Sequence, residues 1–331
     1  AVLVGMAAGA LAQTERKPLL GVCVTGQLKR MEFWSKVHKL IVPNMHNYDI
    51  NMLFVLDFEA KVAVNEHVHV GEPEHVMTAA EIAANVKRYC PRCAVIVEDY
   101  MQPSTPSAPA RYIDDQKKHS MKSAAIQQQR VYTHPRILTS WAACYGGFQQ
   151  FENNHYDVFV RVREDLYIPY NFLVTSSHWS GVVGVQTQCG FDGYNDKAAV
   201  LDARWGFEYF VGPVLNLNSY YAEMRNRTIM RNTETILRAS LIWDKVPVKV
   251  LTPNQLPFIV TRTRADGSLC FADAPPKTGP RLSCIPAPAR ALWSKYRCGG
   301  SASLHDVERF VPEQGDNHTP GEESAPGITV H

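Results

Sequence analysis

The sequence predicts an α/β fold in which helices cover both faces of a mainly parallel sheet. Short apolar runs at 18–26, 50–58 and 93–100 have the length and composition of buried strands. Segments with helical spacing of apolar residues, 30–45 and 78–89, separate them. This alternation favours parallel strands joined by crossover helices. Hydrophobic residues make up 45% of the 331-residue chain, enough for a sizeable core.

Further along the first half, local signals mark where elements begin and end. Thr78 and Glu81 form a capping box at the start of the helix at 78–89. A stretch rich in Pro and Ser, 101–115, predicts a loop. Helical patterns then lie on either side of Pro135, which cannot donate a backbone hydrogen bond. They predict two helices, at 120–132 and 136–152.

The second half alternates in the same way. The segment 156–169 reads as a buried strand that ends in a cluster of charge. Further strands are expected at 181–188, 197–202, 246–251 and 257–263. Helices are expected at 203–224, with a break at Gly212-Pro213, and at 232–243.

Composition divides the chain into three parts. Residues 1–12 are apolar and end in Ala-Leu-Ala, like the end of a secretory signal peptide or an anchor. A frayed apolar terminus is the alternative. Residues 13–298 are expected to form a single domain, and residues 299–331 a polar, disordered tail. No later segment is long and apolar enough to span a membrane. The chain is therefore expected in the secretory pathway, in the ER or Golgi lumen, or secreted.

The eight cysteines fit that compartment, because an even number in a secretory chain permits disulfides. At least one disulfide is expected among Cys270, Cys284 and Cys298, which lie in a Pro- and Gly-rich region. The CPRC sequence at 90–93 has no second CxxC, which favours a local cysteine pair over a zinc site. A glycoprotein is also expected, with acceptor sequons at Asn226 and Asn317.

Charge is balanced overall and concentrated locally. The formal net charge of +2 gives no strong field, so nucleic acid is not an expected partner. Locally, the strand at 156–169 ends in Arg161, Arg163, Glu164 and Asp165. Because side chains alternate along a strand, Arg161, Arg163 and Asp165 are expected on one face, and Glu164 on the other.

Such a strand end suits an anionic ligand and its metal ion. Ligands bind outside the carboxyl ends of the strands in open α/β sheets. The arginines could pair with phosphates, and Asp165 could hold a divalent cation that bridges two of them. The alternative is a buried ion-pair network that only ends the strand.

The stretch after the first strand suits the same ligand. Gly26 lets a ligand approach the backbone closely between Thr25 and Gln27. Lys29 and Arg30 follow at once and could meet a diphosphate. An ordinary strand-to-helix turn is the alternative.

The stretch at 190–202 suits a sugar. It places Asp192, Asn195 and Asp196 among two glycines and two aromatic residues. A sugar ring has apolar faces and a rim of hydroxyls, which aromatic rings, carboxylates and amides can contact together. A Gly/Asn/Asp turn between strands is the alternative.

Four segments occur in a set order: VTGQLKR, YDVFVRVREDL, GYNDKAAVLDARWGFEYF and NTETILRASL. Together they resemble GT-A-type nucleotide-diphospho-sugar glycosyltransferases, above all the branch with capsular and surface polysaccharide enzymes and related algal and protist proteins. The resemblance extends from residue 18 to 250. It implies a GT-A-like, Rossmann-like fold, a catalytic domain at 13–298 and a hexosyltransferase activity.

The resemblance also implies substrates and a cofactor. The donor would be a nucleotide-sugar, and the acceptor a glycan, protein or lipid. Asp165 would hold Mn²⁺ or Mg²⁺ on the donor diphosphate. Further positive charge would come from Arg161, Arg163 and either Lys29 or Arg30. The implied donor-binding set also includes Thr25, Gly26, Gln27 and Asn195.

The acceptor hydroxyl needs a base if the reaction inverts configuration, and the candidates are Asp196 and Glu234. Glu234 has an alternative role, a favourable interaction with the N-terminus of its own helix.

Two departures from the branch bear on the metal and on the activity. Lys197 stands where the branch often has Arg after Asn-Asp, and the place of the Asp-x-Asp metal motif reads Arg163-Glu164-Asp165, without the first Asp. Metal dependence is therefore left open. The alternative function is a non-catalytic secreted carbohydrate-binding or interaction protein that retains the fold.

Overall fold

The structure is a computed structural model that describes residues 16–59, 76–100, 108–119, 124–186, 192–228, 230–263, 269–272 and 287–296. A seven-stranded sheet in the order β3-β2-β1-β4-β7-β6-β8 forms its centre. Only β7 runs against the other strands of this sheet. In sheet order the strands are β3 (Ala94–Asp99), β2 (Asp49–Asp57), β1 (Leu19–Gln27), β4 (Val158–Arg163), β7 (Ala198–Asp202), β6 (Val183–Gln186) and β8 (Val248–Leu251).

The predicted α/β class and mainly parallel sheet are confirmed. A second, three-stranded sheet is antiparallel and consists of β5 (Leu166–Tyr167), β9 (Ile259–Thr263) and β10 (Leu269–Phe271). The helical elements are η1 (Leu28–Arg30), η2 (a π-helix, Lys36–Ile41), α1 (Val42–Asn44), α2 (Ala79–Tyr89), α3 (Ala110–His119), α4 (Ala124–Phe148), α5 (Ser176–Trp179), η3 (Ala203–Trp205), α6 (Gly206–Phe210), α7 (Gly212–Ser219), α8 (Tyr221–Arg225), α9 (Thr233–Trp243), η5 (Ala287–Ala289) and α10 (Arg290–Tyr296).

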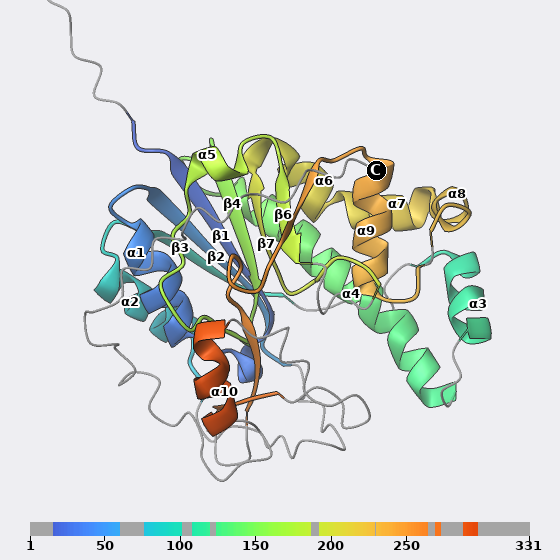
Figure 1. The fold of residues 1–331 in the computed structure, drawn as a ribbon, viewed down its shortest axis with the longest axis horizontal. Coiled ribbons are helices and arrows are strands. Elements are labelled where there is room, and N and C mark those ends of the chain that lie inside the picture. Colours follow the sequence, from blue (N-terminus) through green and yellow to red (C-terminus); the bar gives the residue numbers. More distant parts are fainter. Residues whose placement is uncertain are drawn as a thin grey trace, which may run out of the picture.

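Helices cover both faces of the central sheet, as the alternation of side chains along the strands requires (Figure 1). On β1, Val22 and Val24 face the core under η2 and α2. Cys23 lies between them and faces the core under α4, α6, α7 and α9. Each face therefore has its own apolar core, and a polar side chain at a strand end can be assigned to one face by its position.

Two predicted boundaries are wrong, both around α4. A single helix, α4, continues through Pro135 where two helices were expected. Leu138 and Trp141 are fully buried against the sheet, so packing outweighs the one backbone hydrogen bond that Pro135 cannot make. Helix α3 begins at Ala110, inside the expected loop, because Tyr112 is buried and its hydroxyl lies 2.6 Å from His134 Nδ1 of α4.

The expected long helix at 203–224 is divided into η3, α6, α7 and α8. The break falls where Gly212 and Pro213 were expected to interrupt it, and Pro213 stands in the first turn of α7. In the described ranges no helix is both long and apolar enough to cross a membrane.

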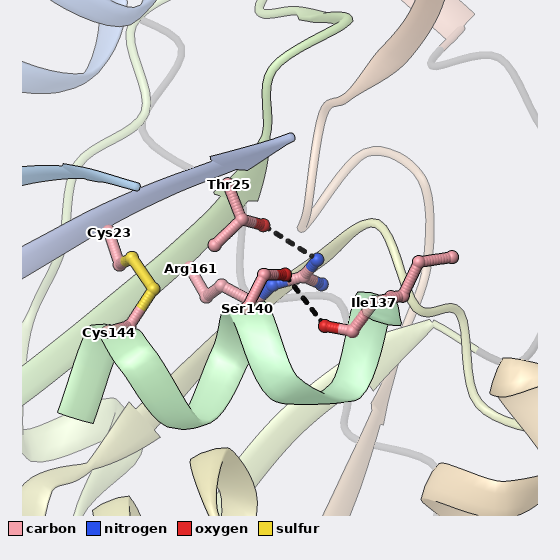
Figure 2. The surroundings of a disulfide bond; sticks show 6 residues. All are labelled: Cys23, Thr25, Ile137, Ser140, Cys144 and Arg161. Atoms are coloured by element: carbon pink, nitrogen blue, oxygen red, sulfur yellow. Dashed lines mark hydrogen bonds between the residues drawn. A yellow bond between two sulfur atoms is a disulfide. The ribbon is translucent and has the colours of Figure 1, made fainter. Parts of the chain in front are cut away.

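Disulfides link the described cysteines. Cys90 and Cys93 are joined, which confirms the local pair. Cys23 of β1 is joined to Cys144 of α4, a link between the sheet and its covering helix (Figure 2). Cys270 is also disulfide-bonded. The other two residues of the expected set, Cys284 and Cys298, lie outside the described residues, as does the sequon at Asn317.

Candidate active site

The four segments that carry the family resemblance meet at one edge of the central sheet. Strands β1 and β4 are parallel, with Thr25 opposite Arg163, so both end there. Strand β7 is antiparallel to β4 and therefore begins at the same edge, directly after Asn195, Asp196 and Lys197. Tyr194 N donates to Glu234 O at 3.1 Å, which holds the start of α9 against the segment before β7.

Arg161 is a buried support of this edge. Its side chain is on the α4 face of β4, only 1% of the residue is exposed, and its guanidinium lies 4.1 Å from the ring centre of Trp141. Arg161 Nη2 donates to Thr25 Oγ1 at 3.1 Å (Figure 2), and Nη1 donates to Asp196 O. Burial lowers the pKa of Arg161. Its contacts join the end of β1 to the start of β7.

Asp165 is fully buried beneath three arginines. Arg163 donates from Nη2 to Asp165 Oδ2 at 2.8 Å and also from Nε to Oδ1. Arg30 and Arg262 donate to Oδ2, Arg262 at 2.6 Å. Burial alone would raise the pKa of Asp165, but the three guanidiniums hold it well below its ordinary value. Asp165 is therefore ionised and saturated with cationic donors.

Arg262 was not predicted as a site residue. It is on β9, 97 residues after Asp165, and the apolar pattern of its strand does not indicate a site residue. Docking of the second sheet explains its position, because Thr261 N and Thr261 Oγ1 donate to Asp165 O at 2.7 and 2.8 Å.

Glu164 lies at the site beside Asp165. The expectation that the two carboxyls lie on opposite faces of the strand is wrong. Strand β4 ends at Arg163, and Glu164 and Asp165 form a turn, so alternation no longer applies. Glu164 Oε1 lies 3.6 Å from Arg30 Nη2. A Cβ on Gly26, whose φ is +138°, would stand 1.8 Å from Glu164 Oε2. Glycine is thus required here because the buried carboxyl covers its Cα.

A buried lysine holds this turn. Lys36 Nζ donates to Glu164 O at 2.9 Å and Leu166 O at 2.7 Å, on both sides of Asp165, and also to Glu32 O. Glu32 in turn accepts from Ser35 N at 2.9 Å. Burial lowers the pKa of Lys36. Three carbonyl groups accept from the ammonium, so Lys36 holds the backbone on both sides of Asp165.

The second acidic pair consists of Asp196 and Glu234, with Lys197 between them. Lys197 Nζ lies 3.1 Å from Asp196 Oδ1 and 3.4 Å from Glu234 Oε1. Burial, then the charge of Asp196, raises the pKa of Glu234 to about 7. Burial would also raise the pKa of Asp196, but Lys197 and the nearby arginines hold it below its ordinary value. The environment therefore raises the pKa of Glu234 and lowers that of Asp196.

The remaining predicted residues surround these groups. Gln27 Oε1 is buried without a hydrogen-bond partner. Asn195 Oδ1 accepts from Lys197 N at 2.9 Å, so Asn195 shapes the turn before β7. Lys29 and Arg30 both belong to η1, and Arg30 is the one bonded to Asp165. Asp192 is exposed, and its carbonyl accepts from Arg238 of α9.

Asp165 and its neighbours do not fit a divalent cation. Both carboxylate oxygens already accept hydrogen bonds from guanidiniums, and three positive charges would repel the ion. In the described part of the chain, no group of three or more His, Cys, Asp or Glu is arranged to hold a metal ion.

No protein-family model and no curated protein matches the sequence. Among solved structures, the chain is similar to mouse xyloside xylosyltransferase 1 in its apo form, with a TM-score of 0.38 and 12% identity over 71% of this chain and 86% of that one. It is also similar to the glycosyltransferase GlyE of Streptococcus pneumoniae, with a TM-score of 0.34 and 10% identity over 72% of this chain and 46% of that one. At these scores the function must be argued from the site itself.

Proposed function

We propose that the chain is a glycosyltransferase that moves a sugar, expected to be a hexose, from a nucleotide-diphospho-sugar to a hydroxyl of a glycan, protein or lipid. The observation that carries the proposal is the meeting of two unlike groups at one sheet edge. One is a cluster of arginines suited to a diphosphate. The other is a pair of buried carboxyls with opposite pKa shifts.

Glu234 is the better base of the two candidates. A general base works best when its pKa lies near the working pH, and that of Glu234 is about 7. Asp196 is held in its ionised form by Lys197 and is a weaker base. In an inverting transfer the acceptor oxygen bonds to the anomeric carbon and its proton goes to Glu234. The bond from that carbon to the diphosphate oxygen breaks, and the nucleotide leaves with the electron pair.

The leaving diphosphate gains negative charge as that bond breaks. Arg30 and Arg163 stand at the ends of η1 and β4, where fixed guanidiniums can stabilise such charge. Arg161 acts through other groups, because its bonds to Thr25 and to the Asp196 carbonyl position both segments.

The secretory pathway remains the proposed compartment. Its support is the disulfides, since such bonds persist in oxidising compartments such as the ER lumen. The sequon asparagine Asn226 is exposed, as glycosylation requires.

A non-catalytic carbohydrate-binding protein is the second candidate. It is favoured by one observation, the saturation of Asp165 by arginines, since a closed ion-pair network can be purely structural.

Thermal stabilisation by ligands separates the two. A nucleoside diphosphate at about a hundred times its dissociation constant should stabilise the enzyme by about 2.7 kcal/mol, while the nucleoside without phosphate should not. Stabilisation by free sugars or glycans but by no nucleotide would favour the binding protein.

A further inference from the structure

We infer, building on the proposed function, that Arg30, Arg163 and Arg262 bind the donor diphosphate directly, in the place where the family resemblance puts a divalent cation. Asp165 then acts as the buried group that holds the three guanidiniums together. Donor binding should accordingly need no metal ion.

The three arginines are brought together from separate parts of the chain. Arg30 comes from η1, Arg163 from the end of β4 and Arg262 from β9 of the second sheet. Their side chains are 22%, 21% and 23% exposed, whereas the Asp165 side chain that joins them is 0% exposed. The three arginine side chains therefore keep partial access to solvent, whereas the carboxylate that they share does not.

The three guanidiniums have more N–H donors than Asp165 uses. Each guanidinium carries five N–H donors in a planar fork that matches phosphate oxygens. Arg262 uses Nη1 for Asp165 and for the Thr261 carbonyl. Arg30 uses Nη2 for Asp165, and Arg163 uses Nε and Nη2 for it. A bound diphosphate can accept from the remaining terminal N–H groups while Asp165 keeps its own bonds.

The charge balance favours an anion over a cation. Three guanidiniums outnumber the carboxyls of Glu164 and Asp165, and burial and then the charge of Asp165 raise the pKa of Glu164. A divalent cation would add positive charge to this group. A diphosphate brings the opposite charge, and charge-assisted bonds between guanidinium and phosphate are among the strong ones.

Arg262 is the residue that tests the inference most specifically. The hydrogen bonds of Thr261 to the Asp165 carbonyl fix the backbone next to Arg262, and its guanidinium is one of the three that donate to the Asp165 carboxylate. Replacing it by Gln removes one charge and one fork, and leaves the Asp165 bonds to Arg30 and Arg163. Loss of a charged hydrogen bond to phosphate should weaken binding about 10- to 100-fold.

The experiment is calorimetric titration of the full chain with four nucleoside diphosphates (UDP, GDP, CDP and ADP) and with inorganic pyrophosphate. Each is measured in EDTA and in Mn²⁺. The variants are Arg262→Gln and Arg262→Lys, which keeps the charge but loses the fork. The control is Arg204→Gln, at an exposed arginine paired with Asp202 at the opposite edge of the sheet. Melting temperatures confirm that each variant is folded.

The expected result is binding of pyrophosphate and of at least one nucleoside diphosphate in EDTA. Binding should be weakened at least tenfold by Arg262→Gln, less by Arg262→Lys, and not by Arg204→Gln.

Other results would overturn the inference in distinguishable ways. Nucleotide binding that requires Mn²⁺, or that Arg262→Gln leaves unchanged, would contradict the arginine site and leave the proposed function standing. Pyrophosphate binding in EDTA without any nucleotide binding would keep the arginine site and contradict the donor class. Binding of neither compound in EDTA or Mn²⁺ would overturn both proposals.

Discussion

Replacing Glu234 by Gln should change stability and activity in opposite directions. The side chain stands in the first turn of α9, nearly buried, 3.4 Å from Lys197. Gln keeps the shape and removes the ionisable group. If the carboxyl stabilised its helix, removing it would lower the free energy of unfolding. A buried base that is retained for chemistry destabilises the fold, so removing it should raise the free energy of unfolding.

The pKa of Glu234 gives the size of this cost. It rises from 4.5 to about 7 on folding, which at about 1.4 kcal/mol per pKa unit corresponds to about 3 kcal/mol. A raised folded-state pKa means that the folded protein holds the proton more tightly than the unfolded one. This stabilisation is therefore present below about pH 4.5 and is lost as pH rises through about 7. Coupling to Asp196 makes 3 kcal/mol an upper value.

The assay is denaturant unfolding of wild type and Glu234→Gln at pH 5 and pH 8, with donor turnover measured on the same samples. At pH 8 the variant should be more stable than wild type by up to about 3 kcal/mol, and at pH 5 the difference should fall below about 1 kcal/mol. Turnover should fall about a hundredfold to ten-thousandfold. Wild-type turnover should rise with pH around 7, because the base must be deprotonated.

The matched control is Glu223→Gln on α8, where the side chain is exposed. It should change neither stability nor turnover. Two findings would refute the reasoning: a Glu234→Gln protein that is less stable than wild type at pH 8, or one that is equally active.

Three further predictions concern the framework of the site. The two cysteines that link β1 to α4 are 121 residues apart, and replacing both by alanine should destabilise the protein by about 5 kcal/mol in the chain-entropy model. The same change at the local pair in 90–93 should destabilise it by about 2 kcal/mol. Equal losses in denaturant unfolding would contradict this. Gly193→Ala should lower the melting temperature and the turnover, because the new Cβ would stand 2.1 Å from a backbone carbon of α9. The control Gly146→Ala has open space around its Cβ and should stabilise the protein by about 0.5–1 kcal/mol. A Gly193→Ala protein with unchanged melting temperature and turnover would show that the turn can move. Lys36→Met should destabilise by about 1–3 kcal/mol or more, since it leaves buried carbonyls unpaired; unchanged melting would exclude that role.

Much of the site could be predicted because it consists of strand ends. The apolar runs located β1 and β4 within a few residues, and parallel strands bring their carboxyl ends to one edge. That geometry places Thr25 and Arg163 side by side, although 138 residues separate them. The start of β7 reaches the same edge only because β7 is antiparallel, which no local pattern indicated.

The rest depends on contacts that local patterns do not encode. Arg262 enters through the docking of a separate small sheet, and Lys36 through burial under the turn at Glu164. Strand alternation failed after Arg163, because Glu164 and Asp165 form a turn and do not continue the strand. The Cys23–Cys144 disulfide likewise depends on which helix packs on β1, a choice made by the tertiary fold.

The central claim is that this sheet edge binds a nucleotide-diphospho-sugar and transfers its sugar. The most direct measurement is release of nucleoside diphosphate from a panel of nucleotide-sugars, with water or added glycans as acceptors, in EDTA and in Mn²⁺. The account predicts turnover of at least one donor by wild type, and a loss of at least about a hundredfold in Glu234→Gln without a loss of donor binding. A folded wild-type protein that consumes no donor under either condition would contradict it.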